Sequence, residues 1–175
     1  VDVEIYEKDA QIFSCASSSN QNRLHQGFHY PRSAVTRQQS SQGFNEFLAK
    51  YEFLVRKVNK NIYAVDNTKS LIDFETYLSI MRASNLIFDE IQCPPAHFRN
   101  LSGFIYTNEM LIDAVAAKDY FRRTLQGVIN LQTEVDISDV VNHKRSISVL
   151  GKSYDFVVDC TWGQFDGRPD LDVFF

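Results

Sequence analysis

Apolar and polar residues alternate over the first residues of the chain, which read V-D-V-E-I-Y-E-K. A period of two places Val3 and Ile5 on one face of an expected strand. The run stops at an acidic residue, Glu7. A strand that ends in a carboxylate is typical of the second strand of a dinucleotide-binding βαβ unit, where the carboxylate accepts hydrogen bonds from ribose hydroxyls.

A polar segment without periodicity follows, and its Ser, Asn and Gln residues predict a loop over Ser14–Gln26. Pro31 interrupts the backbone pattern, and a long amphipathic helix is expected after it. The apolar stripe of this helix consists of Phe44, Phe47, Leu48, Tyr51, Leu54 and Val55.

The middle of the chain mixes strand and helix signals. Lys57–Val65 has strand character, and Ser70 with Asp73 forms a capping pair for a short helix. Further strands are expected at Ile87–Ile91 and Leu101–Tyr106. The apolar face of the short helix consists of Phe74, Tyr77, Leu78 and Met81.

A third helix precedes a strand-rich end of the chain. Gly127 is expected to end this helix, and strands are expected at Val128–Val135, Ile137–Val141, Ser146–Leu150 and Tyr154–Asp159. The order of elements predicts an α/β protein with an inserted, partly antiparallel middle section. The third helix carries Ala117, Tyr120, Phe121 and Leu125 on one face.

A chain of 175 residues with 44% hydrophobic and 23% charged residues has the composition of one globular domain or slightly more. The net charge of -4 argues against nucleic acid or an anionic membrane as a partner. No apolar run approaches the roughly 20 residues that span a bilayer. Cys15, Cys93 and Cys160 form no Cys-x-x-Cys pair, so reduced thiols and a cytoplasmic location are expected.

Several side chains could bind a nucleotide. Glu7 could accept hydrogen bonds from two ribose hydroxyls, or it is a solvated charge at a strand end, paired with Lys8. The run Ser17–Asn20 could offer hydroxyl and N–H groups to a pyrophosphate, with Arg23 neutralising phosphate charge, or it is a surface loop. Gly27 would let the backbone approach a flat ring closely.

His25 and His29 are four residues apart, which on a helix would place two imidazoles on one face, as in a metal site. The residue before Pro31 avoids the helical region and no third ligand has suitable spacing, so no metal site is predicted. His25 is expected either beside the cofactor or substrate or as a structural histidine. Thr161 and Gly163 follow an expected strand, where open α/β sheets bind ligands, and a simple strand-exit turn is the alternative.

Four stretches resemble, in the same order, the D-amino-acid oxidase family of FAD-dependent oxidoreductases. They are Val3–Lys8, Ala16–Pro31 with its Ser-rich run and His-Gln-Gly, Gly127–Val135, and Tyr154–Gly163. The last resembles a strand that ends in Asn-Ala-Thr-Gly, although here it reads Asp-Cys-Thr-Trp-Gly. Together the four stretches span most of the chain.

The resemblance implies a partial FAD-binding, Rossmann-like domain of the glutathione-reductase type at residues 1–56 and 115–175. Residues 57–114 would be an inserted mixed α+β portion of a substrate domain. FAD is the implied cofactor, with its ribose on Glu7 and its adenine against the backbone of Val135. The implied cofactor-binding residues are Glu7, Lys8, Ser18, Ser19, Arg23, Leu24, His25, Val135, Thr161 and Gly163.

The resemblance also implies an activity, the oxidation of a C–N or C–O bond of a small amine, amino acid or hydroxy acid by hydride transfer to flavin. The sequence contains no Gly-x-Gly-x-x-Gly turn. We therefore expect the chain to be a portion of such an enzyme and, alone, to be colourless and inactive. A sheet edge exposed in such a portion would favour homo-oligomers.

Two alternatives stay open. The chain could be a non-catalytic interaction domain derived from such an enzyme. It could also belong to another Rossmann-type enzyme that binds NAD or S-adenosylmethionine, although the His-Gln-Gly segment argues against this.

Overall fold

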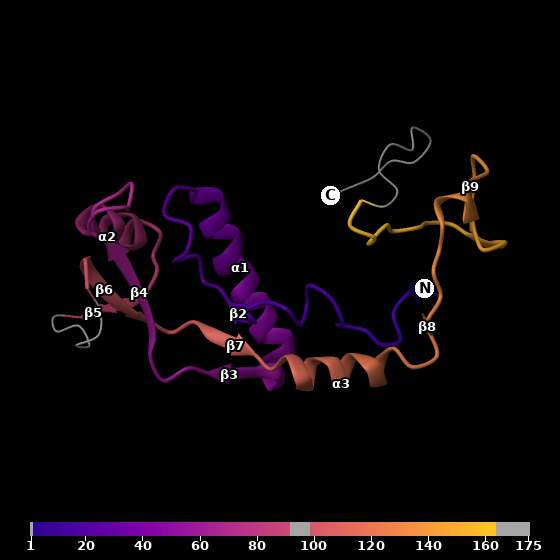
Figure 1. Ribbon diagram of the computed structural model, residues 1–175, viewed down its shortest axis with the longest axis horizontal. Helices are drawn as coiled ribbons and strands as arrows, with labels where there is room; N and C mark the ends of the chain where they lie inside the picture. Colours follow the sequence, from indigo (N-terminus) through magenta and orange to yellow (C-terminus); the bar gives the residue numbers. More distant parts are fainter. Residues whose placement is uncertain (1, 92–98, 164–175) are drawn as a thin grey trace. The chain divides into compact units, whose positions relative to one another are not determined.

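The computed structural model describes residues 2–91 and 99–163 (Figure 1). The chain divides into two compact units, one formed by residues 15–120 and the other by the residues up to 14 and from 121 onward. Three α-helices and a set of short strands within the described residues confirm the expected mixed α/β class. No helix in these ranges is long and apolar enough to cross a membrane.

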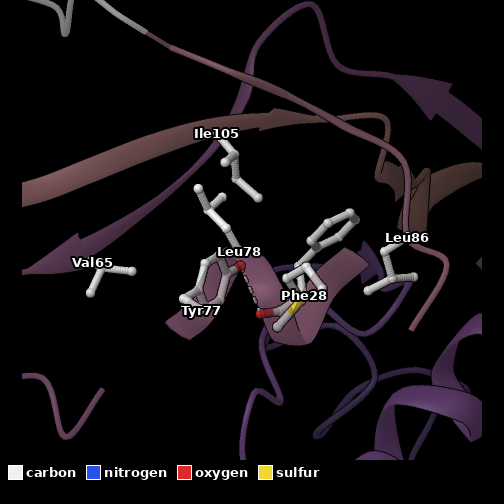
Figure 2. Packing of buried hydrophobic residues seen from close by; sticks show 7 residues of the cluster. Phe28, Val65, Tyr77, Leu78, Leu86 and Ile105 are labelled. Carbon is white, nitrogen blue, oxygen red and sulfur yellow. Dashed lines mark hydrogen bonds between the residues drawn. The ribbon is translucent and has the colours of Figure 1, made fainter. Parts of the chain in front are cut away.

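The first sheet of the unit 15–120 has the strand order β4-β6-β5, with both pairs antiparallel. Its strands are β4 (Asn61–Asp66), β5 (Phe88–Glu90) and β6 (Leu101–Thr107). Helix α2 (Phe74–Ala83) contributes to the same hydrophobic core, as Figure 2 shows. That core consists of Phe28, Val65, Tyr77, Leu78, Met81, Leu86 and Ile105.

Helix α2 begins where the sequence predicts, but Asp73 caps it without Ser70. The Asp73 carboxylate accepts hydrogen bonds from the Thr76 N–H at 2.7 Å and from the Thr76 hydroxyl at 2.8 Å. The Ser70 hydroxyl instead bonds to the backbone of Ile72. One side chain therefore satisfies the first turn, as is usual for an Asp N-cap.

The second sheet of this unit has the order β2-β7-β3, again antiparallel. Its strands are β2 (Arg23–Leu24), β3 (Val55–Lys57) and β7 (Met110–Ile112). β2 lies inside the segment expected to be a loop. β7 pairs with the other two strands, so segments that are far apart in the chain form one sheet.

Helix α1 (Ala34–Tyr51) is capped by Ser33, whose hydroxyl accepts from the Thr36 N–H. The expected apolar stripe continues past its end, because Leu54 lies in the short 3-10 helix Glu52–Leu54 and Val55 begins β3. The expected strand over residues 57–65 is divided between β3 and β4 because the chain turns at residues 58–60 to reach the other sheet.

Strand β7 joins β2 and β3 within the unit formed by residues 15–120. The expected domain boundaries at 56/57 and 114/115 stay predictions. Helix α3 (Ala114–Thr124) follows β7. The assignment of residues 57–114 to a substrate domain stays a prediction.

In the other unit, β1 (Ile5–Glu7) pairs in parallel with β8 (Ile129–Leu131). β9 (Val140–Asn142), β10 (Ile147–Val149) and β11 (Lys152–Tyr154) form an antiparallel sheet with β10 in the centre. Its core consists of Val140 and Val149, packed against Tyr6, Val135, Ile147 and Tyr154.

The strands expected near the end of the chain are shorter than predicted or do not form. β8 stops at Leu131 because Gln132 adopts a left-handed φ of 53°. Ile137–Asp139 is a 3-10 helix, so only its continuation forms β9. The strand expected at residues 154–159 was wrong, because β11 ends at Tyr154 and residues 155–160 pair with no described strand.

Gly103 in β6 is required by the ring of Phe74. A Cβ at this position would lie 2.2 Å from the Phe74 ring, so Gly103→Ala must displace a side chain next to the core. We expect a loss of about 1–3 kcal/mol in the free energy of unfolding, measured by urea denaturation followed by circular dichroism. Gly43→Ala on α1 is the control, since nothing lies within 4 Å of its Cβ position. Equal stabilities of the two variants would contradict the prediction.

Glu4 should make the other unit sensitive to acid. Its carboxylate accepts hydrogen bonds from the hydroxyls of Tyr154 and Tyr6, each at 2.7 Å, and pairs with Lys152 at 3.0 Å. These contacts, the Tyr154 hydrogen bond first, lower the Glu4 pKa from 4.5 to about 2. Because the pKa is lower in the folded state, the stabilisation is present above pH 4.5 and lost as the pH falls towards 2.

Glu4→Gln should therefore flatten acid unfolding of this unit within that pH window, monitored by NMR. Glu134→Gln, which replaces an exposed carboxylate of the same unit, should leave the acid dependence unchanged. An unaltered acid profile of Glu4→Gln would argue against this role of Glu4.

Candidate functional site

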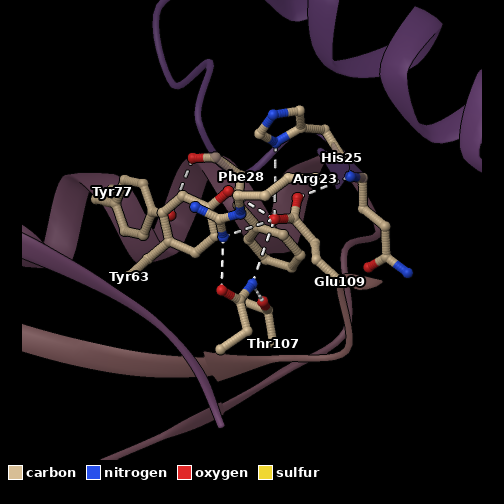
Figure 3. A network of polar contacts seen from close by, with 9 residues as sticks. Arg23, His25, Phe28, Tyr63, Tyr77, Thr107 and Glu109 are labelled. Carbon is tan, nitrogen blue, oxygen red and sulfur yellow. Dashed lines mark hydrogen bonds and ion pairs between the residues drawn. The ribbon is translucent and has the colours of Figure 1, made fainter. Parts of the chain in front are cut away.

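Glu109 lies at the junction of β6 and β7, and its side chain is only 1% exposed. Oε1 accepts a hydrogen bond from the Gln26 N–H at 2.7 Å. Oε2 accepts from the Tyr63 hydroxyl at 2.6 Å, the Arg23 Nη2 at 3.1 Å and the Asn61 Nδ2 at 3.3 Å (Figure 3). Both oxygens of a buried carboxylate are therefore satisfied, as such a group requires.

Arg23 supplies the positive charge that compensates Glu109. Its Nη2 also donates to the Asn61 Oδ1 at 2.6 Å, and its guanidinium lies 4.9 Å from the centroid of the Tyr63 ring. Asn61 in turn donates to the Thr107 hydroxyl at 2.7 Å. The guanidinium expected to neutralise a phosphate is thus held by protein groups in this structure.

His25 lies beside this network without completing a hydrogen bond to it. Its Nδ1 is buried, has no hydrogen-bond partner among the described residues, and lies 3.8 Å from the Glu109 Oε2. The rings of His29 and Tyr30 lie 6.1 and 6.3 Å from the His25 ring. The side chain is 32% exposed, so one part of the imidazole faces solvent.

The surroundings of His25 disfavour its charged form. Burial lowers the pKa of His25 most, and the positive charge of Arg23 and the neighbouring His29 lower it further. Glu109 acts in the opposite direction and raises it. Because these effects together lower the His25 pKa below its usual value of 6.5, the imidazole is mostly neutral at pH 7.

Two tyrosines keep their protons next to this carboxylate. Burial, followed by the hydrogen bond to Glu109, raises the pKa of Tyr63, so its hydroxyl remains a donor. Burial also raises the pKa of Tyr77, whose hydroxyl donates to the Phe28 carbonyl at 3.0 Å. The loop that follows His25 is thereby tied to the core.

The glycine at position 27 allows a close approach of the backbone, as expected, but the neighbour in this structure is helix α1 and no flat ring. Gly27 has a φ of 115°, and a Cβ there would lie 3.0 Å from the backbone of Arg37 in α1. Arg37 donates to the carbonyls of Tyr30 at 2.9 Å and Pro31 at 2.7 Å, and its Nε donates to the Ser84 hydroxyl at 2.7 Å. Helix α1 therefore fixes the backbone around His25.

Glu7 ends β1 with acceptor capacity to spare. Its Oε1 accepts the Asp9 N–H at 2.9 Å, and its backbone carbonyl accepts the Thr133 N–H. An ionised carboxylate offers about four acceptor positions, so one such bond leaves room for ribose hydroxyls. The exposed Lys8 follows directly. The ribose-binding role of Glu7 stays a prediction.

Several donors of the serine-rich loop are engaged within their own turn. The N–H and hydroxyl of Ser18 both donate to the Cys15 carbonyl, and the Ser19 N–H donates to the Ala16 carbonyl. Asn20 also donates to the Ala16 carbonyl. A pyrophosphate could use these groups only after the turn rearranges.

Thr161 is engaged in a similar way. Its N–H and hydroxyl both donate to the Asp159 carboxylate, at 2.7 and 2.6 Å. Gly163 has a φ of 82° and follows Trp162, whose side chain is 91% exposed. The segment is a local turn, and it does not end a strand. Val135 packs against the small core of the β9–β11 sheet.

The ten residues implied by the family resemblance are divided between the two units. Arg23 and His25 meet at Glu109, while Leu24 is buried and pairs with Met110. Ser18 and Ser19 belong to the same unit. The other unit contains Glu7, Lys8, Val135, Thr161 and Gly163.

Sequence reasoning missed Glu109, Tyr63 and Asn61, and no local signal marks them. The hydrogen bonds of Glu109 join residues 46 to 86 positions apart. Within the described ranges no three His, Cys, Asp or Glu side chains could hold a metal ion. Cys15 and Cys160 are exposed, and Cys93 lies outside the described residues.

Removing the charge partner of Glu109 should destabilise the unit 15–120. Arg23→Ala leaves a carboxylate with 1% exposure facing no guanidinium, and we expect a loss of about 3–5 kcal/mol in the free energy of unfolding. Arg82→Ala is the matched control, since its pair with Glu90 is exposed and should contribute at most about 1 kcal/mol. Chemical denaturation of both variants tests this, and similar losses would refute it.

No family model matches the chain. The chain is similar to the FAD-dependent monooxygenase FPY4 of Fusarium mangiferae, with 37% identity over 171 residues. The aligned region covers 98% of this chain and 45% of the relative. The chain therefore spans about half the length of the curated relative it matches.

Proposed function

We propose that this chain is part of an FAD-dependent oxidoreductase and supplies part of its cofactor site. The observation that carries the proposal is the 37% identity, along nearly the whole chain, to a protein named as an FAD-dependent monooxygenase. The strand end at Glu7 supports it, because the carboxylate there retains acceptor capacity for ribose hydroxyls. Membership of the D-amino-acid oxidase family specifically is the finer part of the proposal.

When bound, FAD supplies the redox chemistry. The protein binds the cofactor, orients it against the substrate and excludes competing reactions. In this proposal Glu7 holds the ribose, while Lys8 and Val135 lie along the adenosine portion. The second stretch, from Ser18 to His25, serves the pyrophosphate and the flavin end. There the imidazole of His25, 32% exposed and mostly neutral at pH 7, can donate or accept a hydrogen bond.

The remaining residues of the proposed site need local rearrangement. Ser18, Ser19 and Thr161 must exchange hydrogen bonds within their turns for bonds to the cofactor. Arg23 is held by Glu109, so it contributes to the field around the site while remaining paired. Leu24 and Gly163 would contribute backbone contacts.

Two reactions are compatible with this cofactor. The family resemblance favours hydride removal from a C–N or C–O bond of a small amine, amino acid or hydroxy acid. The name of the relative favours a second candidate, in which one oxygen atom of O₂ enters an organic substrate and the other is reduced to water with two electrons from an external reductant, a reduced nicotinamide by chemical class, and two protons. Isotopic labelling with ¹⁸O₂ separates them, since only monooxygenation places the label in the organic product.

Titration with FAD tests the cofactor assignment. We expect the isolated 175-residue chain to remain colourless and inactive, and the full-length protein to bind FAD and absorb visible light. In the full-length protein Glu7→Gln should weaken FAD binding by about tenfold or more, because hydrogen bonds to a charged acceptor are lost. Binding is measured by the quenching of FAD fluorescence.

Glu46→Gln, which replaces an exposed carboxylate on α1, is the control and should bind FAD like the wild type. Tight, stoichiometric FAD binding by the isolated chain would contradict the expected dependence on further segments. A full-length protein that binds no FAD would refute the proposed function.

A further inference from the structure

Glu109 lies next to two residues of the proposed site, Arg23 and His25. It pairs with Arg23 at 3.1 Å, and its Oε2 lies 3.8 Å from the His25 Nδ1. Its Oε1 also binds the N–H of Gln26, the residue next to His25. One buried carboxylate thus faces both the backbone and the ring of the histidine segment.

We propose that Glu109 is the positioning residue of this site, which holds Arg23 in place and controls the orientation and protonation of His25. The inference rests on the proposed function, in which His25 lies near the flavin or the substrate. Glu109 itself is buried and acts through the other two side chains.

Glu109 can control His25 because several donors compete for one of its carboxylate oxygens, Oε2. Oε2 already accepts hydrogen bonds from Tyr63, Arg23 and Asn61. A protonated Nδ1 of His25, at 3.8 Å, must compete with these donors for the same oxygen. Protonated His25 needs Oε2 as a hydrogen-bond acceptor, whereas neutral His25 does not. Removal of another donor from Oε2 should therefore favour the imidazolium.

The charged and titratable groups around His25 act in opposite directions. Arg23 from β2 and His29 from the following loop disfavour the imidazolium, and burial does so more strongly. Glu109, from the β6–β7 junction, favours it. The ring of Tyr30 lies beside both histidines. Loss of the Glu109 charge should therefore lower the pKa of His25, and loss of a donor that competes for its carboxylate should raise it.

A purely structural ion pair would behave differently. If Glu109 served only to neutralise Arg23 and join the two sheets, its replacement would alter stability and leave the titration of His25 in place. The pKa of His25 is therefore the readout that separates positioning from stabilisation, and it requires neither cofactor nor substrate.

NMR titration of the histidine ring protons in the 175-residue chain tests the proposal, with His25 assigned by His25→Gln. In Glu109→Gln the midpoint of His25 should move to lower pH, because the favourable negative charge is lost. In Tyr63→Phe it should move to higher pH, because Oε2 loses one competing donor while the aromatic ring remains. Glu90→Gln, at an exposed ion pair of the same unit, should leave the midpoint unchanged.

Tyr63→Phe keeps the test decisive if Glu109→Gln fails to fold, since an amide would place an N–H donor against groups that are donors themselves. Shifts of opposite sign in the two variants support the proposal, as does an upward shift in Tyr63→Phe when Glu109→Gln does not fold. A folded variant whose His25 midpoint equals that of Glu90→Gln overturns it.

The link to the reaction is tested in the full-length protein loaded with FAD. The pH dependence of the midpoint potential of the bound FAD needs no substrate. Its inflection should move in Tyr63→Phe in the same direction as the His25 titration. An inflection that does not move overturns the role of Glu109 in the reaction. Failure of the full-length protein to bind FAD overturns the proposed function, and the NMR titration still decides whether Glu109 controls His25.

Discussion

A carboxylate that leaves water needs donors on both oxygens and a compensating charge, and Glu109 imposes this requirement on the unit 15–120. Its donors come from β2, from the residue after His25 and from β4, while Glu109 itself connects β6 to β7. The network can form only when both sheets of the unit are in place. The same interaction that stabilises the unit therefore also places Arg23 and His25.

The segment around His25 is also held by α1 and the core. Gly27 lies against the backbone of Arg37, and the carbonyl of Phe28 accepts the hydroxyl of Tyr77. These contacts fix the backbone and leave the imidazole about one-third exposed. A ring held in this way can present one nitrogen to a ligand with little loss of conformational entropy, which is the advantage of a preorganised site.

Hydrogen-bonding capacity separates the residues implied by the family resemblance. Glu7 retains acceptor capacity that a ligand can use and the His25 side chain is 32% exposed, whereas Ser18 and Thr161 donate within their own turns. Short polar side chains in loops commonly satisfy themselves locally. A sequence pattern identifies which residues can donate or accept, but the local turn determines whether they are available.

The sequence by itself determined the helices and most of the strands, because burial of one face imposes a period on apolar positions that a single segment already contains. It also identified Glu7 and His25 as candidate ligand-binding residues from their neighbours in the chain. The tertiary structure alone decided strand lengths, the pairing of β7 with β2 and β3, and the network of Glu109, Tyr63 and Asn61. These features depend on contacts between residues tens of positions apart, and such contacts leave no periodic signature in either segment.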